Sequence, residues 1–92
     1  MSSAAACDLS GRRAWVTGGT AGLGLAIART LLAAGATVAI SGRDARRGQW
    51  ALQQLGSDRA ELVLGDASDA AQARAMVAEL QGRRPELDIV VA

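Results

Sequence analysis

The stretch WVTGGTAGLGLAIARTLLAAG, residues 15–35, places four glycines between an apolar run and an amphipathic pattern. Glycine inside a helix costs roughly 0.5 to 1 kcal/mol relative to alanine, so these glycines are expected where a side chain would obstruct something. Backbone amides at a strand-to-helix turn, together with the positive end of the helix dipole, attract anions. Gly18 is expected to permit the tight turn, Gly22 to let the backbone approach a diphosphate, and Gly24 to let the helix lie close to the sheet.

Short apolar runs alternate with helical patterns along the rest of the chain. Strands are predicted at residues 14–17, 36–41, 61–64 and 87–91. Helices are predicted at residues 23–34 and 45–55, and a third helix is expected to begin after a cap at residue 68 or 69 and to end at residue 80. Each crossover between parallel strands needs a helix, so this order predicts an α/β domain with a doubly wound parallel sheet. Right-handed crossovers give the strand order 3-2-1-4, with two helices on one face and the third on the other.

Helix ends and faces follow from residue type and spacing. Gly35 is expected to close the first helix, and Asp44 to cap the second. Residues three and four positions apart predict the apolar faces, which are Leu23, Ala26, Ile27, Thr30, Leu31 and Ala34 in the first helix, Trp50, Leu52 and Leu55 in the second, and Ala73, Met76, Val77 and Leu80 in the third. Gly48 weakens the prediction of the second helix.

Composition limits the possible functions of these 92 residues, which are enough for one domain. Ten arginines and nine acids are mixed along the chain, so nothing indicates a nucleic-acid partner. The single cysteine, Cys7, leaves no intramolecular disulfide and fits a reducing compartment. Without a secretion signal or an apolar run long enough for a membrane span, we expect a soluble, cytoplasmic protein with no membrane partner.

The absence of histidine disfavours zinc and serine–histidine chemistry, and without lysine no GxxxxGKS phosphate loop is possible.

The segment TGGTAGLG resembles the nucleotide-binding motif of the short-chain dehydrogenase/reductase family, and the segments DLSGRRAWVTGG, GDAS and LDIVVA resemble other parts of the same family. The resemblance implies a Rossmann-type fold that binds NAD or NADP. It places around the diphosphate and the adenosine ribose the residues Gly18, Thr20, Gly22, Leu23 and Gly24. It also implies that Asp66 contacts the adenine amino group beside Ala67, although Asp66 could equally cap the following helix. Ala92 matches the start of the Asn-Ala-Gly segment that lines the nicotinamide ribose in this family.

The end of the second strand, SGRD, bears on the choice of dinucleotide. An NAD site usually has an acid there to bind the ribose 2′-hydroxyl, and here that position is Gly42. Arg43 follows, and its guanidinium can pair with a phosphate. We therefore expect NADP in preference to NAD, with Ser41 and Arg43 among the cofactor-binding residues. Two points oppose this: Asp44 could draw Arg43 aside, and Ala21 stands where the family often has a basic residue.

The catalytic tyrosine and lysine of the resembled family have no counterpart, because the chain contains neither residue type. We therefore assign no catalytic residue. Residues 1–92 are expected to form one dinucleotide-binding domain in which residues 1–9 are flexible. We expect this domain to be the N-terminal part of a longer reductase, truncated after the fourth strand. The resemblance implies hydride transfer to or from a carbonyl or alcohol substrate, and a dimer or tetramer for a complete protein. Alternatives are an inactive nucleotide-binding module and a methyltransferase, and Gly42 and Arg43 disfavour the latter. We also expect the isolated chain to be poorly soluble, or to pair along the free edge of its fourth strand.

Overall fold

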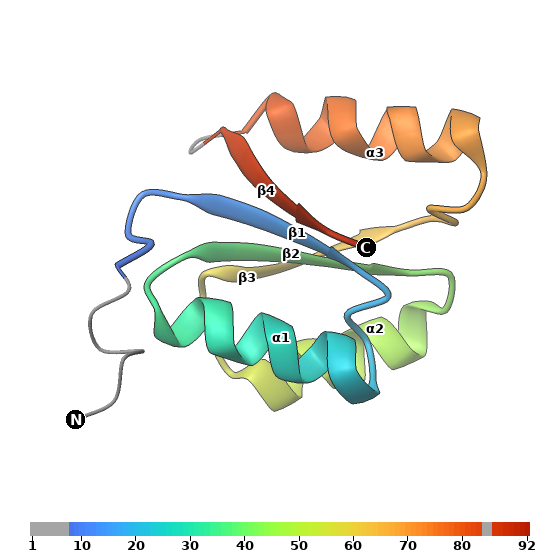
Figure 1. The fold of residues 1–92 in the computed structure, drawn as a ribbon. Coiled ribbons are helices and arrows are strands. Elements are labelled where there is room, and N and C mark those ends of the chain that lie inside the picture. The colour runs from blue at the N-terminus through green and yellow to red at the C-terminus, as the bar shows by residue number, and fades with distance from the viewer. Residues whose placement is uncertain (1–7, 84–85) are drawn as a thin grey trace.

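A four-stranded parallel sheet with the order β3-β2-β1-β4 forms the centre of the molecule in a computed structural model that describes residues 8–83 and 86–92 (Figure 1). The elements in chain order are β1 (Arg13–Thr17), α1 (Gly22–Ala33), β2 (Thr37–Gly42), α2 (Ala45–Leu55), β3 (Ala60–Leu64), α3 (Ala70–Gln81) and β4 (Leu87–Val91). The predicted alternation and strand order are therefore confirmed, and the element ends differ from the predictions by at most one residue.

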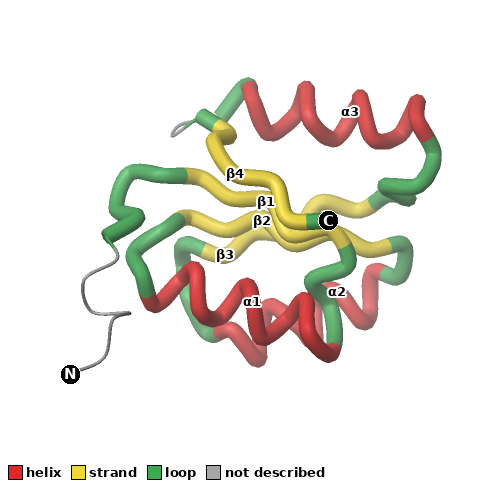
Figure 2. Tube along the Cα trace, in the orientation of Figure 1, coloured by secondary structure: helices red, strands yellow, loops and turns green. Residues whose placement is uncertain are grey.

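Helices cover the two faces of the sheet unequally. α1 and α2 lie together on one face, and α3 lies alone on the other (Figure 2). Among the described residues, β4 pairs only with β1, so its outer edge carries no partner strand. Val90 of this strand is 56% exposed. Two helices thus enclose one side of the sheet while a single helix shields the other.

The face under α1 and α2 holds the larger apolar core. Ala14, Val16, Val38 and Ile40 alternate on β1 and β2 and are almost completely buried there. Alternate residues of a strand point to the same face, so this core is continuous across the paired strands.

The buried stripe of α1 differs from the predicted one. It consists of Leu25, Ala28 and Leu32, whereas Leu23 is 77% exposed and Thr30 is exposed. Ile27 and Leu31 pack against the core from the side. Apolar residues occur on several sides of this helix, so spacing alone does not determine which stripe faces the sheet.

The second helix has the predicted bounds and the predicted N-cap. Asp44 accepts hydrogen bonds from the backbone N–H groups of Arg46 and Arg47, and Gly56 closes the helix in a left-handed conformation. Gly48 is buried, and a Cβ built on it would lie 2.7 Å from both Cδ atoms of Leu62. The glycine that weakened the helix prediction therefore lets α2 approach β3 closely.

The predicted burial of Trp50 is wrong. Its side chain is 48% exposed, and Ala51 is the buried residue at the centre of α2. Leu52 and Leu55 pack against the core as expected. The helix approaches the sheet through its small residues, so the large indole remains on its outer side.

The face under α3 has a smaller core around Trp15, with Ala39 and Val63 on the strands and Met76 and Leu80 on the helix. Asp69, one of the two predicted capping residues, accepts hydrogen bonds from the amides of Ala71 and Gln72 at the start of α3. The indole Nε1 of Trp15 donates a hydrogen bond of 2.9 Å to Oγ of Ser41. A polar pair is therefore part of this core.

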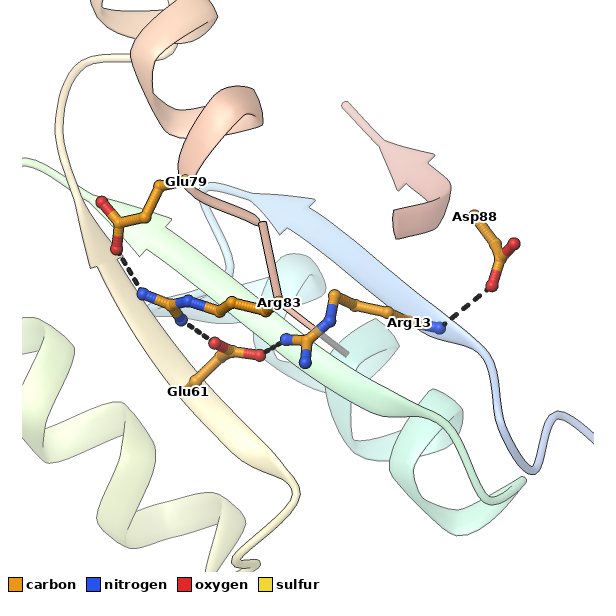
Figure 3. Close-up of polar contacts among 5 residues, drawn as sticks. All are labelled: Arg13, Glu61, Glu79, Arg83 and Asp88. Atoms are coloured by element: carbon orange, nitrogen blue, oxygen red, sulfur yellow. Dashed lines mark hydrogen bonds and ion pairs between the residues drawn. The ribbon is translucent and has the colours of Figure 1, made fainter. Parts of the chain in front are cut away.

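A charged network crosses the amino-terminal ends of the strands on the same face (Figure 3). The side chain of Arg13 on β1 is almost fully buried and reaches across β2 to form an ion pair with Glu61 on β3. Glu61 also pairs with Arg83, which in turn pairs with Glu79 on α3. The backbone amide of Arg13 donates to the Asp88 carboxylate on β4 at 3.3 Å. The network connects three strands and the end of α3.

Part of the predicted flexible N-terminus, residues 1–7 with Cys7, lies outside the described residues. Leu9 packs against the larger core, and its amide donates to the carbonyl of Ala34 at 2.8 Å. The segment entering β1 is thus attached to the end of α1. That attachment uses Gly35, whose φ of +104° and missing side chain leave room for Ser10.

Candidate dinucleotide site

The turn from β1 into α1 has the geometry of an open backbone cradle. Gly18 and Gly22 have φ values of +70° and +56°, a region that residues with side chains rarely adopt. A Cβ built at either glycine has no heavy atom within 4 Å beyond its chain neighbours. The space next to both glycines is therefore free for a ligand.

The other two glycines of the turn are required by close packing. A Cβ on Gly24 would lie 2.5 Å from the carbonyl oxygen of Gly18, so the first turn of α1 packs on the glycine turn itself and not, as expected, on the sheet. The contact with the sheet is made by Gly19, whose Cβ would lie 2.7 Å from Cγ2 of Ile40. This role of Gly19 was not predicted, because its contact with Ile40 joins residues that are distant in the sequence.

The start of α1 differs from the starts of the other helices. Its N-cap, Ala21, provides no side-chain hydrogen bond, whereas Asp44 and Asp69 cap α2 and α3. An uncapped helix N-terminus has amides free to bind an anion, and the helix dipole favours negative charge there. The helix without a side-chain cap is the one that follows the glycine turn.

A cleft of about 240 Å³ lies where β1, β2 and β3 end. Its lining consists of Thr17, Gly18, Ser41, Gly42, Arg43, Gly65, Asp66, Ala67 and Ser68. The carboxyl ends of parallel strands are where ligands bind in open α/β sheets. Sequence reasoning missed Thr17, Gly65 and Ser68, although all three immediately precede or follow residues that it selected.

Of the predicted site residues, five line this cleft, namely Gly18, Ser41, Arg43, Asp66 and Ala67. Thr20, Gly22, Leu23, Gly24 and Ala92 lie outside its lining. Leu23 is exposed at the first turn of α1, next to the open glycine turn, and Ala92 is exposed just after β4. The cleft and the glycine turn share Gly18, so they form adjoining parts of one surface.

Arg43 and Asp66 approach each other across the cleft. Nη1 of Arg43 lies 4.0 Å from Oδ2 of Asp66, and the arginine side chain is 80% exposed. The neighbouring Asp44 caps α2 with its carboxylate, and the carboxylate that Arg43 pairs with is that of Asp66. An exposed pair at this distance is weak, so a phosphate can compete for the guanidinium.

Asp66 shapes the loop after β3. Its Oδ1 accepts hydrogen bonds from the hydroxyl of Ser68 at 2.6 Å and from the Ser68 amide at 2.9 Å. These bonds, first the hydroxyl and then the amide, hold the pKa of the Asp66 carboxyl below its ordinary value, and Arg43 adds a smaller effect in the same direction. The alternative that Asp66 caps α3 is wrong, because Asp69 does so.

Ser41, one of the predicted cofactor-binding residues, lines the cleft and makes two hydrogen bonds within the protein. Its hydroxyl accepts the hydrogen bond from Trp15 on the α3 side of the sheet, and its carbonyl accepts from the amide of Gly18 at 3.1 Å. The hydroxyl and the carbonyl of Ser41 therefore both have partners within the protein. Its carbonyl fixes the start of the glycine turn against the end of β2.

Other surface features lie apart from this cleft. A hollow of about 380 Å³ is lined by Asp44, Arg46, Arg47 and Trp50 on the exposed side of α2 and includes no strand residue. Within residues 8–83 and 86–92, no three or more histidine, cysteine, aspartate or glutamate side chains are grouped so that they could hold a metal ion. None of the described helices is long and apolar enough to cross a membrane.

Comparison with known proteins places this arrangement in a family. The family model described as short chain dehydrogenase matches residues 12–92. The chain belongs to the short-chain dehydrogenase/reductase family. The predicted resemblance is thereby confirmed over nearly the whole chain.

Curated relatives in this family include a "Probable oxidoreductase" of Streptomyces lividans, 39% identical over 92% of this chain and 29% of that protein. The "NADP-dependent (R)-specific alcohol dehydrogenase" of Lentilactobacillus kefiri is 48% identical over 68% of this chain and 25% of that protein. Among solved structures, "Pseudomonas aeruginosa RhlG/NADP active-site complex" superposes with a TM-score of 0.81 at 38% identity, over 90% of this chain and 33% of that chain. The chain therefore spans about a third or less of the length of these dehydrogenase-family members.

Proposed function

We propose that this chain is the NADP(H)-binding part of an oxidoreductase of the short-chain dehydrogenase/reductase type. The observation that carries the proposal is the open glycine turn at the uncapped start of α1, which adjoins the cleft at the ends of β1, β2 and β3. Anion-binding amides beside a cleft of this size suit a nucleotide. The names "Probable oxidoreductase" and "alcohol dehydrogenase" of two relatives add support.

The residues present fit a dinucleotide. Gly18 and Gly22 leave the space that a diphosphate needs, and a Cβ at either position would project into it. We propose that Gly18, Thr20, Gly22, Leu23 and Gly24 surround the diphosphate and the adenosine ribose. Asp66 and Ala67 would hold the adenine, Ser41 would support the turn, and Ala92 would approach the nicotinamide ribose. The bound nicotinamide would supply or accept a hydride, and this chain would hold it in place.

NADP is proposed in preference to NAD because of Gly42 and Arg43. No acid ends β2, and among the described residues Arg43 forms its ion pair with Asp66, at a distance of 4.0 Å. A charge-assisted pair with a 2′-phosphate is stronger than an exposed ion pair at that distance. Support also comes from the words "NADP-dependent" in the name of one relative and "NADP" in the name of one solved complex.

The direct test compares binding of NADPH and NADH to wild-type protein and to Arg43→Ala. If Arg43 pairs with the 2′-phosphate, its loss weakens NADPH binding by about 1.5 to 3 kcal/mol and NADH binding much less. Arg74→Ala on the exposed surface of α3 is the matched control, because it removes the same charge at a distance from the cleft. Equal losses for the two dinucleotides would reject NADP, and binding of neither by the wild type would reject the function.

A second candidate is a nucleotide-binding module without catalysis of its own. The observation that favours it is that these 92 residues contain neither tyrosine nor lysine, the acid–base pair that the family uses. We assign no catalytic residue here and expect no reductase activity from the 92 residues alone. Finding tyrosine and lysine four residues apart in the same reading frame beyond residue 92 would favour the oxidoreductase.

For the complete oxidoreductase we propose a small carbonyl or alcohol substrate, a homo-oligomeric state and a cytoplasmic location. The mixed charge of the chain supports the view that neither nucleic acid nor membrane is a partner. Sedimentation of a complete protein and its fractionation from cells would test the oligomer and the location.

A further inference from the structure

The end of β2 makes a close contact with the glycine turn. A Cβ built on Gly42 would lie 2.9 Å from Cγ2 of Thr20 and 3.5 Å from its Oγ1, and real Cβ atoms essentially never have neighbours under 3.0 Å. The methyl group of Thr20 thus occupies the space in which a side chain at position 42 would begin. Any residue other than glycine at position 42 requires Thr20 to move.

Thr20 has little freedom to move. It is only 8% exposed, and a β-branched side chain has few accessible rotamers. The residue before it, Gly19, is packed against Ile40, and the residue after it, Ala21, is the N-cap of α1. Both neighbours tie the backbone of Thr20 to other elements. A shift of Thr20 would therefore disturb the glycine turn as well as the end of β2.

We propose that Thr20 is a specificity-determining residue that acts through Gly42, a proposal that rests on the function proposed above. An acid at the end of β2 binds the ribose 2′-hydroxyl of NAD and repels a 2′-phosphate. By filling the space beside Gly42, the Thr20 methyl keeps that acid out. Arg43 is then the first side chain after β2 to reach the cleft, and it is the side chain that suits a phosphate.

The test is a cycle of four proteins, namely the wild type, Thr20→Ser, Gly42→Asp and the double variant. Serine removes only the methyl group of Thr20 and keeps its hydroxyl. Dissociation constants for NADPH and NADH are measured for each protein by calorimetry.

Gly42→Asp alone is expected to lose NADPH affinity without gaining NADH affinity, because the new side chain collides with Thr20. The double variant is expected to bind NADH about tenfold more tightly than Gly42→Asp does, and more tightly than it binds NADPH. If Gly42→Asp alone gains the same affinity for NADH as the double variant, the proposal is overturned.

A readout without any ligand tests the contact itself. Gly42→Ala adds a Cβ but no charge, so it is expected to lower the melting temperature, and Thr20→Ser in the same protein is expected to restore most of the loss. An unchanged melting temperature in Gly42→Ala would overturn the proposal. If the wild type binds neither dinucleotide, the proposed function fails and the specificity role with it, although the coupling between residues 20 and 42 in the melting experiment would persist.

Discussion

The two faces of the sheet are stabilised by different interactions. Under α1 and α2 the strands contribute Ala14, Val16, Val38 and Ile40, and the core there is apolar. Under α3 the same strands contribute Arg13, Trp15 and Ser41, so an ion pair and an indole–hydroxyl hydrogen bond accompany the apolar contacts. Both faces come from alternate residues of the same short strands.

One sheet therefore combines two kinds of stabilisation. Apolar packing on the α1 and α2 face depends on volume and tolerates little empty space. The α3 face depends on satisfied charges, because Arg13 is almost fully removed from water and pairs with the partly buried Glu61. Substitutions on the two faces should therefore fail for different physical reasons.

The largest effect is expected on the apolar face. Ile40→Ala removes a fully buried side chain that also supports Gly19, and should lower the free energy of unfolding by about 3 to 4 kcal/mol. Val90→Ala on β4 is the control, since this side chain is 56% exposed and its loss should cost less than about 0.5 kcal/mol. Urea denaturation measures both, and equal losses would contradict the assigned core.

On the charged face, Glu61→Ala leaves the buried Arg13 without its carboxylate and should cost about 2 to 3 kcal/mol. Glu79→Ala breaks only an exposed pair of the same network and should cost less than about 1 kcal/mol. Replacing both partners of this pair, Arg13→Met with Glu61→Leu, should restore most of the stability. If the double replacement is as unstable as Glu61→Ala, packing and not charge explains this face.

A smaller effect is expected where α2 approaches the sheet. Gly48→Ala gains about 1 kcal/mol in helix propensity but adds a methyl group 2.7 Å from Leu62, at a cost of about 1 to 3 kcal/mol. We expect a net loss of about 1 kcal/mol in thermal unfolding. In a Leu62→Ala background the same substitution should become stabilising, and a loss of the same size there would refute the contact.

The smallest effect concerns Asp66, a partly exposed carboxylate that follows the carboxyl end of β3. Its native pKa lies below the ordinary 3.8, so its contribution to stability is complete above that value and is lost as the pH falls through the native pKa. NMR titration of the carboxyl should give a pKa below 3.8 in the wild type. Ser68→Ala should raise the pKa of Asp66, and Arg43→Ala should raise it less. A larger rise in Arg43→Ala would contradict the assigned causes.

Much of the fold was predictable because it depends on local signals. Alternating strand and helix patterns gave the strand order, and Asp44, Asp69 and Gly56 mark helix ends through their own side chains or backbone. The glycine turn was also recognisable, since a positive φ at Gly18 and Gly22 is a local requirement. Membership of the family followed from the same residues.

Features that depend on pairing between distant residues were not predictable. The Arg13–Glu61 pair joins residues 48 positions apart through the register of three strands, and neither residue is unusual by itself. The exposure of Trp50 depends on how closely Gly48 approaches Leu62. The contact of Thr20 with Gly42 likewise appears only when the turn and β2 are folded against each other.

The hydrogen bond from Trp15 to Ser41 makes Trp15 an intrinsic fluorescent probe of the cleft. The indole is buried beneath α3, yet its acceptor belongs to a residue that lines the cleft and binds the amide of Gly18 through its carbonyl. Indole emission responds to the polarity and hydrogen bonding of Nε1, so events at the cleft should alter the fluorescence of the buried Trp15 ring. With Trp50 replaced by phenylalanine, that signal would come from a single fluorophore.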